Sequence, residues 1–154
     1  MLSITQSEAQ NRFRTGSNCA QAVLSTYFQA LGYDENLAHR IGAGLGSGIG
    51  RKQYVCGAVS AGAIVLSGVF GNEDRTNTAQ KDAATERVRG FVDRFEEEFH
   101  TSQCRDLIKM DISTADGRRQ AREAGAFQTV CLSCIAKVCA LLDKEIESSA
   151  NLHR

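Results

Sequence analysis

Apolar residues along the chain recur at the three- and four-residue spacing of amphipathic helices. The segment 19–31 is a clear case, because its apolar residues share one helical face and Ser17 or Asn18 is available as the N-terminal cap. Gly32 is a natural stop for this helix. The alternation of apolar and polar residues that is typical of strands is absent. The pattern therefore predicts an all-α fold.

The same spacing predicts about seven or eight helices, which we expect to form a single-domain bundle over residues 1–154. Asp34, Ser102 and Thr114 are suitable caps, and Gly125 ends one of the helices. Besides 19–31, the predicted helices cover 4–13, 35–41, 54–70, 77–99, a short stretch containing Cys104 and Ile108, 115–124 and 127–146.

The segment from Gln53 to Asn72 contains no charged residue and is about as long as a bilayer span. Its residues are mainly glycine, alanine and serine, which are only weakly hydrophobic. A central helix over Tyr54–Phe70, buried on all sides, explains this composition better than a membrane span does. Small residues allow close helix packing, and a domain of this size offers few helices to cover such a segment, so we expect a homodimer.

Charge and composition narrow the function classes. Eighteen basic residues balance eighteen acidic ones, which argues against a nucleic acid or an anionic membrane surface as the partner. The first eight residues contain neither the basic start nor the apolar stretch of a secretory signal. We therefore expect a cytoplasmic location, where cysteines usually serve as free thiols, metal ligands or catalytic groups.

Five glycines alternate with other residues between Gly42 and Gly50, directly before Arg51 and Lys52. This spacing does not match the G-x-G-x-x-G fingerprint of dinucleotide sites, and no predicted strand precedes it. It is not a P-loop either, since Arg51 rather than glycine precedes Lys52. Two interpretations stay open: a tight connection between helices, or bare backbone N–H groups that approach a ligand or cluster. Under the second interpretation, the candidate cofactor-binding residues are Gly46, Gly48, Gly50 and Arg51.

Six cysteines stand out in a chain that has no proline and no tryptophan. One cysteine on an apolar helix face is most often a small core residue, but six in one domain weaken that interpretation. Cys131 and Cys134 form a C-x-x-C, yet Ile135 follows instead of the histidine of a c-type haem site, and no second C-x-x-C completes a zinc ribbon. Ferredoxin spacings are absent, and the three histidines are isolated. Cysteine spacing alone therefore does not identify a site.

Several short motifs occur in an order that is characteristic of one protein family. They are Gly16–Val23 (GSNCAQAV), the glycine run ending in Gly50-Arg51, Cys56–Ser60 (CGAVS), Cys104–Leu107 (CRDL) and Val130-Cys131. From about Gly16 to Leu142, the chain resembles the family named for a C–GCAxxG–C–C pattern, whose members are described as redox-active. One residue departs from that pattern, because Ala61 stands where the family has glycine, with Gly62 next.

The resemblance leaves Cys134 and Cys139 as extra cysteines and implies a four-cysteine site made of Cys19, Cys56, Cys104 and Cys131. These residues would be the catalytic groups and the metal ligands: they bind an iron–sulfur cluster or another soft metal, or they cycle between thiols and disulfides. A similar domain occurs beside haems in certain cytochromes, where it resembles an iron–sulfur site. An oxidoreductase and an electron-transfer protein both fit, and the redox partner is unknown. The alternative is a non-catalytic helical module that binds a metal or ligand, or whose cysteines are structural.

Local charge leads to a further expectation about Cys56. This residue lies in the first turn of its predicted helix, where unpaired N–H groups and the positive end of the helix dipole favour a thiolate. Arg51 and Lys52 lie a few residues upstream and add positive charge that would stabilise an anion at the site. We therefore expect Cys56 to be the most acidic thiol, and Cys104, beside Arg105, to be the second.

Overall fold

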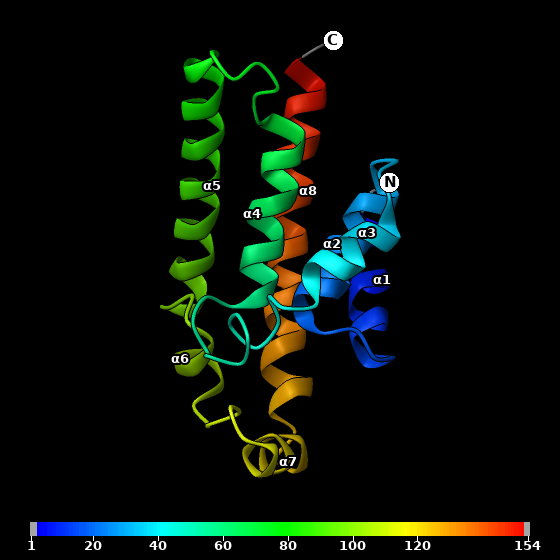
Figure 1. Ribbon diagram of the computed structural model, residues 1–154, viewed down its shortest axis with the longest axis vertical. Coiled ribbons are helices and arrows are strands. Elements are labelled where there is room, and N and C mark those ends of the chain that lie inside the picture. Colours follow the sequence, from blue (N-terminus) through cyan, green and yellow to red (C-terminus); the bar gives the residue numbers. More distant parts are fainter. Residues whose placement is uncertain (1–2, 153–154) are drawn as a thin grey trace.

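A computed structural model describes residues 3–152, and within them it has eight α-helices and one π-helical turn (Figure 1). In chain order these are α1 (Ser3–Arg14), α2 (Cys19–Ala30), α3 (Glu35–Gly42), α4 (Gly57–Phe70), α5 (Thr78–Phe99), α6 (Cys104–Ile108), α7 (Ala115–Glu123), η1 (Phe127–Cys131) and α8 (Leu132–Leu152). The described residues contain no strand beyond an isolated antiparallel bridge between Val55 and Gln103. The predicted all-α fold of about seven or eight helices is therefore confirmed.

Side-chain caps start several helices where the sequence predicts them. The Asn18 side chain accepts a hydrogen bond from the Gln21 N–H at 2.8 Å, and the Gln21 side chain accepts one from the Asn18 N–H at 3.0 Å. This reciprocal pair is a capping box, and it fixes Cys19 as the first residue of α2. Asp34 and Thr114 also cap α3 and α7 through their side-chain oxygens.

The small-residue helix α4 lies at the centre of the bundle, packed against α2, α5 and α8 (Figure 1). Glycine permits α4 and α5 to pack closely, since a Cβ atom added at Gly62 would clash with the ring of Phe91 on α5. Phe91 and Leu142 are fully buried around it. Ser67 and Gly68 near its C-terminal end are exposed, so α4 is covered over most of its length rather than on all sides.

Helix α4 begins at Gly57, later than the sequence pattern predicts. The residues before it are hydrogen-bonded to a distant segment: the Cys56 N–H donates to the Ser102 carbonyl at 2.8 Å, and the Cys104 N–H donates to the Tyr54 carbonyl at 2.6 Å. This pairing is non-local, so helical periodicity does not reveal it. It holds Cys104, the first residue of α6, beside Cys56, the N-terminal cap residue of α4.

The predicted helix over 127–146 is divided in two. Phe127–Cys131 forms the π-helical turn η1, and regular α-helix starts at Leu132 and continues to Leu152. The turn packs against α6, whereas α8 packs along α1 and α4. π-Helical turns are rare in proteins, and those that occur are often found at functional sites. Here the turn contains Cys131.

No single helix in the described part of the chain is long and apolar enough to cross a membrane. The stretches Ala115–Glu123 and Phe127–Ala150 reach the required length and composition only together, as a pair bent by 73°. The apolar helix Gly57–Phe70 is shorter than a span.

Candidate functional site

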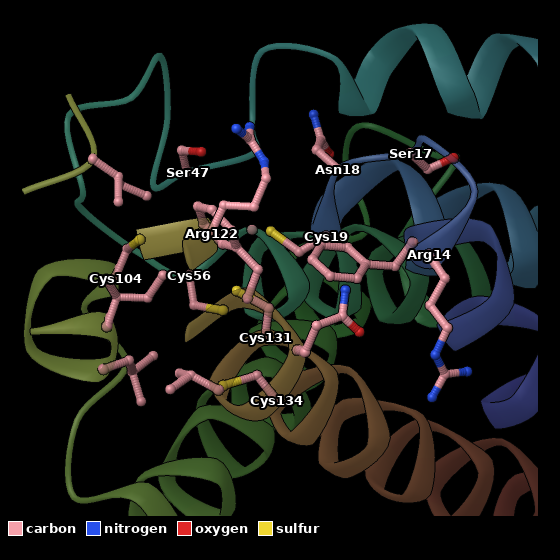
Figure 2. Close-up of a pocket in the computed structure, with 18 of the residues that line it drawn as sticks. Arg14, Ser17, Asn18, Cys19, Ser47, Cys56, Cys104, Arg122, Cys131 and Cys134 are labelled. Atoms are coloured by element: carbon pink, nitrogen blue, oxygen red, sulfur yellow. The ribbon is translucent and has the colours of Figure 1, made fainter. Parts of the chain in front are cut away.

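Five of the six cysteines line one cavity of about 420 Å³ (Figure 2). The four that the sequence predicts as a site come from four elements: Cys19 starts α2, Cys56 precedes α4, Cys104 starts α6 and Cys131 ends η1. The fifth is Cys134, in the first turn of α8. Positions far apart in the sequence therefore meet at one place, as a single site requires.

Three of these thiols are neighbours in series. Cys19 and Cys56 each shift the pKa of the other thiol, and Cys134 raises the pKa of Cys56. Cys104 and Cys131 are close enough for the charge of Cys19 to raise the pKa of each thiol. A change in the charge of one sulfur therefore changes the pKa of the neighbouring thiols.

The cavity cysteines differ in their access to solvent. Cys19 and Cys131 are half-buried, whereas Cys56, Cys104 and Cys134 are buried, with 7%, 8% and 1% of their surface exposed. Cys19 and Cys131 are therefore the cavity cysteines with the larger exposed surface.

Gly57 brings the Cys19 sulfur against the start of α4. A Cβ atom at this position would lie 2.6 Å from Cys19 Sγ, 3.0 Å from the Leu45 carbonyl oxygen and 3.2 Å from Ala20 Cβ. These separations are shorter than van der Waals contact, so a larger residue would push the three segments apart. The motif therefore needs glycine directly after Cys56, because a side chain at this position would clash with its neighbours.

The glycine run contributes to the cavity through Ser47. This residue lines the cavity, and its backbone N–H lowers the pKa of Cys19. The four residues predicted to bind a cofactor do not line the thiol cavity. Gly48 packs against the backbone of Gln53 and Tyr54, and Gly46, Gly50 and Arg51 line a neighbouring shallow hollow that shares Asn18 and Ser47 with the cavity. Sequence reasoning missed Ser47, although a polar side chain within a run of bare glycines was an available signal.

Burial and neighbouring thiols raise the pKa of all four predicted site cysteines. The neighbouring Cys134 raises the pKa of Cys56 most and burial adds to the rise, although the neighbouring Cys19 and the Val59 N–H act in the opposite direction. Burial raises the pKa of Cys104 to about 11, the smallest rise among the four. The expectation that Cys56 is the most acidic thiol is therefore wrong, because its place at a helix start is outweighed by burial among other thiols.

Cys139 lies apart from the cavity, in a buried polar network that links α1, α2 and α8. Its backbone carbonyl lies 2.9 Å from the Tyr27 hydroxyl, which is also 2.5 Å from Asp143 Oδ1. The Thr5 hydroxyl donates to the same carboxylate at 3.1 Å. Burial raises the pKa of Cys139 to about 12. Of the two extra cysteines, only Cys134 joins the candidate site, and its C-x-x-C spacing was the signal for it.

Thiolates are the ligands that soft metals and iron–sulfur clusters prefer, so the donor chemistry of the cavity suits such a group. The side-chain positions do not suit a single ion, because among residues 3–152 no three histidine, cysteine, aspartate or glutamate side chains converge on one point. Metal binding would therefore require several of the side chains to rotate.

The match to a known family covers every cysteine of the cavity. A family model described as "Putative redox-active protein (C_GCAxxG_C_C)" matches residues 17–145. No curated protein and no solved structure matches the chain. Since the family match covers most of the sequence and includes the motifs that form the cavity, the chain belongs to the C_GCAxxG_C_C family of redox-active proteins.

Proposed function

We propose that the protein is a dithiol–disulfide redox protein in which Cys19 and Cys56 form the reacting pair. The observation that carries this proposal is that Cys19 and Cys56 lie side by side at one cavity, where each shifts the pKa of the other, together with their unequal exposure. Cys19 opens into the cavity and can meet an incoming disulfide, whereas Cys56 is buried directly beside it. An accessible thiol with an adjacent partner is what exchange through a mixed disulfide needs.

The exchange would proceed in two steps. Cys19, as a thiolate, attacks one sulfur of the incoming disulfide, so that a new S–S bond forms at Cys19 and one thiolate leaves. Cys56 then loses its proton and attacks Cys19 Sγ, which forms the Cys19–Cys56 disulfide and releases the second thiolate. The two protons of the protein thiols end on the two released thiolates. The protein is thus oxidised by two electrons, and the disulfide is reduced to two thiols.

Backbone groups around Cys19 favour its transient thiolate. The N–H groups of Ser47 and Ala20 lower the pKa of Cys19, although the neighbouring Cys56 and burial keep that pKa above the value of a free thiol. The thiol is therefore mostly protonated at neutral pH, and exchange should accelerate as the pH rises. The cytoplasmic location predicted from the sequence would keep the pair reduced at rest.

Trapping the mixed disulfide tests this assignment. Reduced protein is treated with bis(2-hydroxyethyl) disulfide, quenched with acid, alkylated, digested and mapped by mass spectrometry. The wild type should form a Cys19–Cys56 bridge, and Cys56→Ser should accumulate the adduct on Cys19. Cys139→Ser, which removes a buried cysteine outside the cavity, is the matched control and should behave as the wild type. A first adduct on Cys139, or a bridge that excludes Cys19 and Cys56, would contradict the proposal.

A second candidate function is electron transfer by a bound iron–sulfur cluster or another soft metal. The observation in its favour is the number of thiols, because five around one cavity exceed what a single disulfide needs. The group would be held by thiolates of Cys19, Cys56, Cys104 and Cys131 and would supply electron-transfer chemistry when bound.

Anaerobic purification with iron, zinc and acid-labile sulfide analysis separates the candidates. Stoichiometric iron with visible absorption would favour the cluster, and stoichiometric zinc would favour a non-catalytic module in which the metal serves structure or sensing. In both cases, replacing any one of the four cysteines by serine should release the metal, because the ligands act as a unit. Metal-free protein with a reversible thiol–disulfide couple would favour exchange.

A further inference from the structure

Beyond its thiols, the cavity has a wall suited to an organic molecule. Its apolar lining comes from several segments and consists of Phe13, Leu107, Ile108, Ile112, Phe127 and Val130. Its volume of about 420 Å³ lies within the range of small-molecule pockets. A thiol pair alone needs no such space, so the cavity fits a substrate with an apolar body.

The charged side chains at this cavity are all cationic. Arg14 and Arg122 line it, and no aspartate or glutamate among the described residues does so. In that part of the chain neither arginine has a carboxylate within ion-pair distance, whereas Arg12 and Arg119 each have two. In Figure 2 the side chain of Arg122 starts beside the cysteines and its guanidinium ends between Ser47 and Asn18, while the guanidinium of Arg14 points away from the cysteines. Arg122 is therefore the cation best placed to meet a molecule in the cavity.

Building on the proposed function, we infer that the substrate is a small organic disulfide that carries a carboxylate. The carboxylate pairs with the Arg122 guanidinium, whose planar fork matches two carboxylate oxygens. The apolar body lies against the wall that includes Phe127 and Leu107, and the disulfide reaches Cys19. The bonds, electrons and protons follow the exchange already described, so Arg122 acts as a specificity-determining residue.

Charge also affects the rate of the first step. In water, a thiolate attacks an anionic disulfide more slowly than a neutral one, because like charges repel. An arginine without a carboxylate partner at the cavity offsets this repulsion, so the protein should prefer anionic disulfides more than a free thiol in water does.

Three disulfides of similar size and different charge test the inference: anionic 3,3′-dithiodipropionate, neutral bis(2-hydroxyethyl) disulfide and cationic cystamine. The rate of Cys19–Cys56 bridge formation is measured with each reagent at low ionic strength. Each rate is divided by that of 2-mercaptoethanol with the same reagent, so that differences in reagent reactivity cancel. After this correction the wild type should prefer the anionic to the neutral reagent by about threefold to fivefold, as expected for a partly exposed ion pair.

Arg122→Gln should lose most of this preference while its rate with the neutral reagent changes by less than about twofold. Lys109→Gln is the matched control, because it removes the same charge from a shallow hollow that shares no lining residue with the thiol cavity. It should leave the preference unchanged. Thermal melting of both variants verifies that they are folded.

Two outcomes would overturn the substrate class and leave disulfide exchange intact. The first is equal corrected rates for the anionic and neutral reagents, and the second is an equal loss of preference in Arg122→Gln and Lys109→Gln. A folded protein that forms no Cys19–Cys56 bridge with any of the three reagents would instead overturn the proposed function, and the substrate class with it.

Discussion

Three glycines of α4 differ in the room around them. A Cβ atom would clash with Cys19 at Gly57 and with α5 at Gly62, whereas Gly68 is exposed and has open space at the same position. Ala61, which replaces the glycine of the family pattern, is fully buried, and the close approach to α5 occurs at Gly62 instead. One helix therefore contains glycines that packing requires and one that it does not.

Gly57→Ala should destabilise the protein, because the added methyl group would meet the Cys19 sulfur. We expect the free energy of unfolding to fall by about 1–3 kcal/mol, as is usual for overpacking, and the alkylation rate of Cys19 to change. Gly68→Ala is the control and should gain about 0.5–1 kcal/mol, since alanine favours a helix more than glycine does. Urea unfolding measures both variants. Equal changes in the two would contradict the steric role of Gly57.

At this scale the sequence identifies four of the five cavity cysteines, all by family resemblance. The resemblance left both Cys134 and Cys139 as extra cysteines, and only the C-x-x-C spacing with Cys131 distinguishes Cys134, because a cysteine on an apolar helix is most often a core residue. Ser47 and Arg122 reach the cavity through the path of the whole chain. No local pattern of polar and apolar residues encodes that path.

Among the elements, the short helix α6 depends on a clamp made by Gln53. This residue is buried with a left-handed φ of 57°, and its side chain donates to the Met110 carbonyl at 2.8 Å and accepts from the Ile112 N–H at 3.1 Å. Its own carbonyl accepts the Arg105 N–H at 3.1 Å. Since α6 has only 5 residues and is too short to be stable alone, these bonds hold Cys104 at the cavity.

Gln53→Ala should loosen α6, because it leaves the Met110 carbonyl and the Ile112 N–H, which follow this helix in the chain, without their hydrogen-bond partner. We expect a loss of about 1–3 kcal/mol in the free energy of unfolding and faster reaction of Cys104 with iodoacetamide, with Cys139 as the reference in the same sample. Gln103→Ala is the matched control, since Gln103 is half-buried on the paired segment and its side chain does not cap α6. Similar effects in both variants would show that the clamp is not responsible.

Helix boundaries were predictable wherever a local cap marks them, as at Asn18, Asp34 and Thr114. The start of α4 was not, because residues 54–56 fit a helix by composition but pair with residues 102–104. The turn η1 also escaped prediction, since a π-helical turn departs from the 3.6-residue period that identifies helices.

Across the whole molecule, buried thiols couple stability to alkaline pH. Cysteines with a raised pKa in the folded state hold their protons more tightly than in the unfolded chain, where a thiol has a pKa of about 8.5. Below that pH their contribution to stability is fully present. Above the pKa of the unfolded thiols and below the pKa of about 11 of Cys104, the unfolded chain loses protons that the folded protein retains. The stability of the folded state therefore falls as the pH rises through this range.

The free energy of unfolding should therefore be nearly constant around neutral pH and decrease above about pH 8.5, by at most about 1.4 kcal/mol per pH unit for each buried thiol. Urea unfolding of the reduced protein across this range measures the slope. Cys104→Ser removes one such thiol and should make the decrease shallower. A free energy that rises with pH would contradict the raised pKa values.

The predicted homodimer requires a surface other than α4, whose small residues pack against α2, α5 and α8 within the chain. Leu37 and Ile41 on α3, with Tyr33 just before it, are exposed apolar side chains that a second copy could cover. Light scattering should give a dimer mass that Ile41→Glu reduces to that of a monomer. Ile49→Glu, at an exposed position in the glycine run, should leave the mass unchanged. A monomer at high protein concentration would refute this prediction.

A bond between Cys19 and Cys56 would also restrict the unfolded chain, because it would close a loop of about 37 residues. Loop-closure entropy makes such a cross-link worth roughly 4 kcal/mol of stability. In a thermodynamic cycle the same free energy lowers the reduction potential of the pair in the folded protein by roughly 90 mV relative to the unfolded chain. The redox poise of the surroundings would thus set how strongly the protein resists unfolding and proteolysis.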